Sequence, residues 1–345
     1  MSAIKSEELI THPAILLNQT DSAGGIMNDL LIISSDTIGT VIEDITEPER
    51  LLGANRHYKL YEKIANPDNQ IFKEVYIYIS TPLTSDYILS LSKGNFFDVW
   101  ADAKNARRYG TAMLKNATSI AATTLVINTR GSDFNHFQQN DIITIIDQAN
   151  PDDLTGHQEF ARIQSIQWNG DEATLQIQSL YIEEGLRYAY NIQRTLNGVD
   201  IPTRISSCIE YGDVTSNVSI VEKNTIEGTT NVDAIQINNI AGITQVLTFT
   251  FESATDFQVS SNLDISLPSG QKITDYEPYN PNYDLPYLTI SPEFWLGNWA
   301  AGESLKISTT PSACPYWVIV DIPPNSSDSD KELFDINISG NSSSS

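Results

Sequence analysis

The sequence predicts an all-β protein, with an extended N-terminal arm followed by two or three small antiparallel β-barrel or β-sandwich domains. Segments in which apolar and polar residues alternate, such as 75–79 and 173–180, recur along the chain, and this alternation is typical of half-buried strands. Turn signals separate them, for example Asn169-Gly170, a pair that suits a tight hairpin turn. The chain has 345 residues, of which 40% are hydrophobic, so it can form more than one core.

Residues 1–54 are expected to form the arm. Their apolar runs, 30–33 and 40–42, are short, so their period does not distinguish strand from helix. Gly24 and Gly25 permit backbone angles that other residues avoid, which predicts a sharp turn. Because the segment has too few alternating residues for a core of its own, we expect it to dock onto a partner. Gly24 and Gly25 are therefore candidate interface residues.

Residues 55–210 are expected to contain a β-hairpin followed by a small barrel or sandwich. The hairpin would pair the segments 58–63 and 72–80 around a turn rich in Asn, Pro and Asp. Several short alternating segments follow residue 119, and such a series is typical of a small β-barrel or sandwich.

The last part of the chain divides into two predicted regions. Residues 211–240 are rich in Ser, Thr, Asn and Val, which predicts a polar linker or edge strands. Residues 241–345 are expected to form a C-terminal β-sandwich, because alternating segments separated by loops recur throughout them.

A loop rich in Tyr and Pro is expected within this sandwich, because Pro lacks the N–H that a central strand needs. Its rings and those that follow it are candidate interface residues: Tyr279, Tyr283, Tyr287, Trp295 and Trp299. Three interpretations are open. The rings could form a platform for a host-surface glycan, anchor a protein interface, or cover the core of their own sandwich.

The sequence shows no recognisable catalytic, cofactor-binding or metal-binding motif. The four histidines lack the spacing of metal ligands, and there is no nucleophile elbow, Walker loop or dinucleotide fingerprint. The formal net charge is −24, which argues against nucleic acid or an anionic membrane as the main partner, since phosphate contacts need Lys and Arg. We therefore expect no enzymatic activity and no cofactor.

The two cysteines, Cys208 and Cys314, do not form a metal motif or a disulfide framework. Cys208 follows a polar segment and Cys314 precedes a proline, which suits loop or sheet-edge positions. Three states are open: a disulfide to a neighbouring chain after release from the reducing cytoplasm, an internal Cys208–Cys314 bond, or two unreactive thiols.

Two parts of the chain resemble a known family. The motifs are Gly24-Gly25-Ile26-Met27, Glu49-Arg50-Leu51-Leu52-Gly53, Arg56-His57-Tyr58-Lys59-Leu60-Tyr61, Asn66-Pro67-Asp68-Asn69 and, near the other end, Cys314-Pro315-Tyr316-Trp317. In order and spacing they resemble an uncharacterised family of virion structural proteins from contractile-tailed phages and Mu-like prophages. The chain departs from that pattern at Ile26, where the family has Arg, and at His57-Tyr58-Lys59, where Tyr-Arg-Lys is usual.

The resemblance implies a non-enzymatic virion protein, associated with the tail or baseplate or fibre-like, that joins other virion proteins and forms a homo-oligomer in the particle. A place in the neck is one alternative, and a module that binds a glycan or receptor on the host is another. Residues 1–20 show no secretory signal, so we expect synthesis in the host cytoplasm and a final place in the tail region of the virion.

Overall fold

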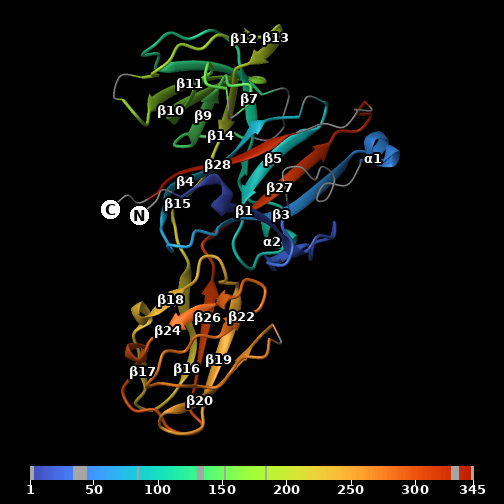
Figure 1. Cartoon of the computed structure of the whole chain (residues 1–345). Helices are drawn as coiled ribbons and strands as arrows, with labels where there is room; N and C mark the ends of the chain where they lie inside the picture. Colours follow the sequence, from blue (N-terminus) through green and yellow to red (C-terminus); the bar gives the residue numbers. More distant parts are fainter. Residues whose placement is uncertain are drawn as a thin grey trace.

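The computed structural model places three β-rich parts one after another, a barrel, a central body and a distal domain (Figure 1). It describes residues 4–33, 45–83, 85–129, 136–150, 153–182, 185–263, 265–327 and 334–342. The strand pairs of the described residues are antiparallel, and only short helical segments occur among them. The prediction of an all-β fold built from small antiparallel units is therefore confirmed.

The central body is a sandwich of two sheets. The larger sheet has the order β2 (Gly24–Met27), β1 (Leu9–Leu16), β3 (Ala54–Ile64), β27 (Ala313–Ile322), β5 (Ile88–Lys93) and β6 (Arg108–Tyr109). The smaller sheet has the order β15 (Ile209–Val214), β4 (Phe72–Thr81) and β28 (Asp335–Ser342). Apolar side chains of β3, β5 and β27 meet those of β4 and β15 in one core. β27 is buried at all but one of its ten residues, as a central strand covered on both faces must be.

The barrel is closed by six strands in the order β10 (Gln158–Asn169), β11 (Glu172–Ser179), β8 (Thr124–Asn128), β7 (Thr111–Leu114), β14 (Arg204–Ser207) and β9 (Ile142–Ile146). Every second residue of β11 is buried, because successive side chains of a strand point to opposite faces. The predicted Asn-Gly turn joins β10 to β11, with Gly170 at φ +62°. A separate ribbon pairs β12 (Gln193–Leu196) with β13 (Val199–Pro202).

The distal domain contains a five-stranded sheet and a cover of short strands. The sheet has the order β16 (Asn217–Asn224), β26 (Ser304–Thr310), β19 (Gln245–Phe251), β20 (Asp256–Ser261) and β21 (Gly270–Gln271). The short pairs are β17 (Thr229–Thr230) with β25 (Trp295–Leu296), β18 (Ile235–Ile237) with β24 (Leu288–Ile290), and β22 (Tyr279–Asn280) with β23 (Leu285–Pro286). Aromatic residues dominate the core between sheet and cover.

The helical segments of the described residues are one or two turns long. They are η1 (Ser6–Glu8), α1 (Glu47–Leu52), α2 (Trp100–Ala103), η2 (Val232–Ala234) and η3 (Pro292–Phe294). Thr46 is the N-cap residue just before α1, and its backbone N–H donates to the Glu49 side chain at 2.8 Å, as in a capping box.

The barrel and the distal domain are both insertions into the central body. The chain leaves the body after β6, forms the barrel and returns as β15. It leaves again to form the distal domain, and returns as β27 and β28. The body therefore contains strands from both ends of the chain, and the other two parts project from opposite ends of it (Figure 1).

This path corrects several predicted boundaries. Residues 9–27 are not a separate arm, because β1 pairs with β3 and β2 pairs with β1 in the body sheet; residues 1–3 and 34–44 of the predicted arm lie outside the described residues. β3 and β4 lie in different sheets and do not form the predicted hairpin. The C-terminal region is divided, since β27 and β28 belong to the body.

The region predicted as linker or edge strands, 211–240, contains the end of β15 and all of β16. β15 is an edge strand of the smaller body sheet, and β16 is an edge strand of the distal sheet. This stretch therefore connects the two sheets, and each of its two edge strands pairs on one side only, β15 with β4 and β16 with β26.

Candidate functional site

A charged cluster is buried beneath Gly24 and Gly25, the first two residues of β2, on the face of the larger body sheet that points away from the core. Lys59 lies on this face because its neighbours Tyr58 and Leu60 point into the core. Its Nζ lies 2.5 Å from Asp98 Oδ1 and donates to the carbonyl oxygens of Asp98 at 2.9 Å and Gly25 at 2.6 Å. All three donors of the ammonium group are thus used.

Asp98 holds the opposite charge in the cluster. Its carboxylate accepts a hydrogen bond from Trp317 Nε1 at 3.0 Å, and its carbonyl accepts one from the N–H of Gly25 at 2.9 Å. The Lys59 side chain is fully buried, and the Asp98 side chain is 7% exposed. Burial lowers the pKa of Lys59, and the nearby Asp98 carboxylate opposes this shift. A buried ion pair tolerates its desolvation only with good geometry and further hydrogen bonds, and the cluster supplies both.

The two candidate interface glycines are packing positions within this cluster. Gly24 is buried at φ +103°, and a Cβ there would lie 2.7 Å from the ring of Trp317. Gly25 is half-buried at φ +78°, and its carbonyl also accepts a hydrogen bond from the Tyr61 hydroxyl at 2.5 Å. The predicted turn is not at these glycines, because they begin strand β2; the turn lies just before them, at Asp21-Ser22. Gly24 and Gly25 pack against the body of their own chain. The assignment of Gly24 to an interface is wrong, because its surface is already covered.

The cluster holds a loop, residues 94–98, that displays two phenylalanines. Asn95 Oδ1 accepts hydrogen bonds from the N–H groups of Phe97 at 2.8 Å and Asp98 at 2.9 Å, and Asp98 Oδ1 accepts one from the N–H of Asn95 at 3.2 Å. The ring of Phe96 packs on Tyr61 at 5.9 Å between centroids. Phe97 is 54% exposed. The loop therefore presents an apolar ring to solvent from a backbone that is hydrogen-bonded on both sides.

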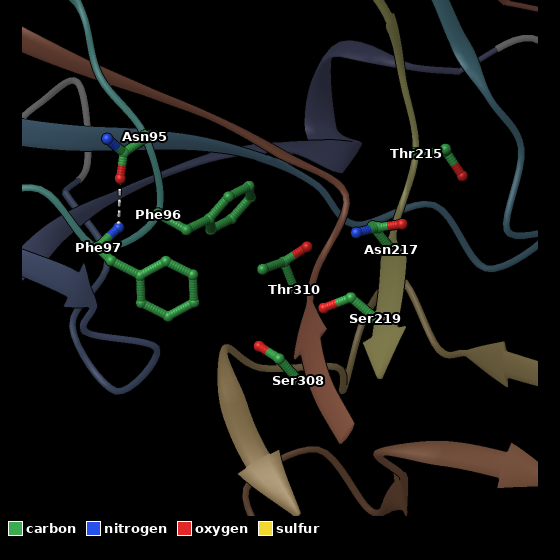
Figure 2. Close-up of a pocket in the computed structure, with 8 residues that line it drawn as sticks. All are labelled: Asn95, Phe96, Phe97, Thr215, Asn217, Ser219, Ser308 and Thr310. Carbon is green, nitrogen blue, oxygen red and sulfur yellow. Dashed lines mark hydrogen bonds between the residues drawn. The ribbon is translucent and has the colours of Figure 1, made fainter. Parts of the chain in front are cut away.

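This loop forms one wall of a cleft of about 440 Å³ between the body and the distal domain (Figure 2). β16 and β26 form the other wall. Their register pairs Ser219 with Ser308 and Asn217 with Thr310, so these four side chains share one face of the sheet. The eight residues that line the cleft are Asn95, Phe96, Phe97, Thr215, Asn217, Ser219, Ser308 and Thr310. None of them is charged.

A second buried lysine fixes the distal domain against the body. Lys63 Nζ donates to Asp29 Oδ1 and to the carbonyl of Ile240, both at 2.7 Å, and lies 4.9 Å from the centroid of the Tyr283 ring. The Tyr283 hydroxyl donates to the carbonyl of Asp29 at 3.1 Å. Burial lowers the pKa of Lys63 and raises that of Tyr283. Ile240 and Tyr283 belong to the distal domain, so this contact helps to set the width of the cleft.

The five predicted aromatic interface residues do not form one surface. Tyr287, Trp295 and Trp299 are only 3%, 6% and 2% exposed. Tyr283 is half-buried at the contact with Lys63, and Tyr279 is 52% exposed. The prediction of an exposed aromatic patch is wrong for the three buried rings, which cover the core of their own domain. The prolines keep the Tyr- and Pro-rich segment out of the five-stranded sheet, but the short strand pairs that this segment forms lie across that sheet.

Both cysteines are free and buried. Cys208 packs with Tyr78 and Phe160 where the barrel meets the body, and Cys314 lies in the body core on β27. Burial raises the pKa of each thiol well above its ordinary value, which makes both unreactive. The expected loop or edge position is wrong for Cys314, which lies in a central strand, whereas Cys208 lies between β14 and β15 as expected but is buried. Neither thiol is exposed for an inter-chain disulfide.

The sequence-based search missed Asp98 and the residues of the cleft. One local signal was present. Gly94 and Asn95 are residue types that favour turns, which predicts a loop here but not which of the two rings is exposed.

Comparison with protein-family models, curated proteins and solved structures finds no match. Within the described ranges, no group of three or more His, Cys, Asp or Glu side chains is placed to hold a metal ion. None of the helices that the structure describes is long and apolar enough to cross a membrane. What the described residues of the cleft offer is hydrogen bonding by neutral side chains and contact with an exposed ring.

Proposed function

We propose that this chain is a non-enzymatic structural component in the tail region of a contractile-tailed phage virion, associated with the baseplate or fibre-like, where it joins other virion proteins. One observation carries the proposal. Motifs that resemble the virion family lie far apart in the sequence, yet Gly24-Gly25, Lys59, Tyr61 and Trp317 meet around Asp98. This convergence supports the interpretation that the motifs belong to one structural unit.

Another pair from the same motifs forms a direct contact. Arg56 Nε donates to Glu49 Oε1 and Arg56 Nη2 donates to Glu49 Oε2, both at 2.8 Å. This two-pronged ion pair lowers the pKa of Glu49 to about 2. At the departure from the family pattern, the ring of His57 stacks on Trp100 with centroids 4.1 Å apart. The motif residues thus form contacts that shape the body of the molecule.

The arrangement of the three parts is suited to joining other proteins. The barrel is tied to the body by Ser206 Oγ, which donates to the carbonyl of Ile79 at 2.5 Å, and by Gln158 Nε2, which donates to the Tyr78 hydroxyl at 2.6 Å. The distal domain is tied to the body through Lys63. A body with two firmly attached projections can bridge neighbours on opposite sides.

The test measures whether the chain is incorporated into assembled particles. Particles from the host strain that carries the gene are purified on a density gradient, and the chain is measured in each fraction by quantitative mass spectrometry against a sheath protein and a host cytoplasmic enzyme. We expect it to sediment with the sheath protein at a fixed ratio. Recovery only with the cytoplasmic enzyme, together with normal tails in a deletion strain, would refute the proposal.

Position within the particle separates the tail from the neck. Gold-labelled antibody against the chain should mark the distal tail in negative-stain images. Label at the junction between head and tail would favour the neck instead. The second functional candidate, a module that binds a host glycan, is favoured by the ring and hydroxyl groups of the cleft.

A further inference from the structure

We propose that the cleft between the loop 94–98 and strands β16 and β26 binds a neutral saccharide. This assignment concerns the chemistry of the cleft itself, so it can be tested on the purified chain whether or not the virion role is correct. It rests on the exposed ring, on the unengaged polar side chains, and on the size and charge of the space between them.

The first element is the ring of Phe97. A sugar ring has an apolar face of C–H groups, which packs against an exposed aromatic ring. Phe97 is 54% exposed, and its backbone N–H is bound to Asn95 Oδ1 at 2.8 Å (Figure 2). Because Asp98, the next residue, is held by Lys59 and Trp317, the ring is displayed from a fixed position. A platform that is already ordered loses little conformational entropy when a ligand binds.

The second element is the opposite wall. Asn217, Ser219, Ser308 and Thr310 form two cross-strand pairs on one face of the sheet, and none of them is fully buried. The hydrogen bonds of the described residues do not engage the side chains of these four, so their hydroxyl and amide groups are available to a ligand. Hydroxyl groups both donate and accept, as the hydroxyls of a sugar do.

The third element is the size and charge of the cleft. Its volume of about 440 Å³ falls in the range of roughly 300–1,000 Å³ that is usual for small-ligand sites. The chain has a net charge of −24, yet none of the residues that line the cleft is charged. Further along the same pair of strands, Lys306 and Glu222 pair with each other at 2.5 Å. The cleft therefore has no fixed charge to select an ionic ligand.

A polypeptide strand is a poorer fit to these groups. Strand addition uses the backbone hydrogen bonds of an open sheet edge, whereas the cleft exposes side chains on the face of β16 and β26. The open edge of β16 also carries Glu222 and Lys223 beside a bulge, and charges and bulges on an edge discourage pairing.

The experiment uses the purified full-length chain and saturation-transfer NMR. The probes are the neutral trisaccharides maltotriose, cellotriose and chitotriose, with 3′-sialyllactose as an acidic comparison, each at millimolar concentration. We expect transfer to at least one neutral probe, strongest at the C–H groups of a single sugar ring, and weaker transfer to the acidic one. Sedimentation with insoluble cellulose and chitin shows whether the cleft also takes a saccharide that is part of a polymer.

Three variants locate the site. Phe97→Ala should weaken binding about ten-fold, because the platform is lost. Ser219→Arg should abolish it by occupying the cleft from an exposed strand position that leaves the loop untouched. Tyr279→Ala is the matched control, since Tyr279 is 52% exposed but does not line the cleft, and it should bind as the parent does. Circular dichroism checks that each variant is folded.

Two results would overturn the assignment. One is the absence of transfer to all three neutral probes with the parent chain. The other is binding that survives both Phe97→Ala and Ser219→Arg, which would place the saccharide elsewhere on the molecule.

Discussion

Replacing Lys59 with methionine tests whether the buried cluster determines the local structure of the body. The substitution keeps most of the side-chain volume and removes the charge, so Asp98 stays buried without its counter-ion. Removing one partner of a buried ion pair costs about 3–5 kcal/mol. We expect the lower end, about 3 kcal/mol, because Asp98 keeps its hydrogen bonds from Trp317 Nε1 and the N–H of Asn95.

Hydrogen exchange read by mass spectrometry measures this cost where it arises. The N–H of Gly25 donates to the carbonyl of Asp98, and the N–H of Trp100 donates to that of Ala23. A loss of about 3 kcal/mol should lower the protection of both amides about 100-fold, since each 1.4 kcal/mol is a factor of ten. Peptides of the barrel should keep their protection, because the barrel has a core of its own.

The matched control is Lys104→Met in the same region. Lys104 Nζ lies 3.2 Å from Asp21, and the two side chains are 41% and 67% exposed. An exposed pair contributes at most about 1 kcal/mol, so this variant should change protection less than ten-fold. The double variant Lys59→Met with Asp98→Asn removes both buried charges and should regain at least half of the loss. Equal effects of Lys59→Met and Lys104→Met would refute the reasoning.

Three further predictions follow from buried groups. Burial raises the pKa of Glu62 from 4.5 to about 7, with an opposing hydrogen bond from Thr11, so the stability that its proton contributes is complete below pH 4.5 and is lost as the pH rises through 7. Glu62→Gln should therefore raise the free energy of unfolding at alkaline pH by up to about 3 kcal/mol, seen as a higher Tm, and should not raise it in acid. An equal gain at both would contradict this. Gly24→Ala should lower the free energy of unfolding in urea by more than about 2 kcal/mol, because Gly24 has a positive φ and lies against the Trp317 ring. Gly25→Ala has open space around its Cβ and should lower it by about 1 kcal/mol. Similar losses for the two variants would count against the packing argument. Trp299→Ala should lower the free energy of unfolding by about 3–5 kcal/mol, because the ring stacks on Phe251 with centroids 4.7 Å apart. Faster hydrogen exchange should be confined to amides of the distal domain. A distal domain that keeps its stability would favour the interpretation of Trp299 as a surface contact residue.

Local features of the chain were predictable because their causes are local. The Asn169-Gly170 turn forms where its geometry requires it, and the alternation in 173–180 appears as alternate burial on β11. Pairing between distant strands was not predictable, since an alternating pattern shows which face of a strand is buried but not which strand lies beside it. β27 therefore pairs with β3 and β5 across more than two hundred residues of sequence.

The two buried lysines show that contacts between distant segments were also unpredictable at the candidate site. Alternation along β3 places Lys59 and Lys63 on one face, and a face with two lysines is usually exposed to solvent. Here segments from elsewhere in the sequence cover them, with residues 24–25 and 94–98 over Lys59 and the distal domain over Lys63. No local pattern predicts such a cover, so the cleft that it forms could not be derived from the sequence.

The positions of these two lysines explain how the two walls of the cleft are held together. They lie on the same face of β3, four residues apart, which is about 13 Å along a strand. Lys59 and Tyr61 bind the loop that carries Phe97, through the carbonyl oxygens of Asp98 and Phe96. Lys63 binds the distal domain that carries the opposite wall. Both walls are thus fixed to one rigid strand, and the width of the cleft is set before any ligand arrives. A ligand that fits this width binds without the cost of ordering the site.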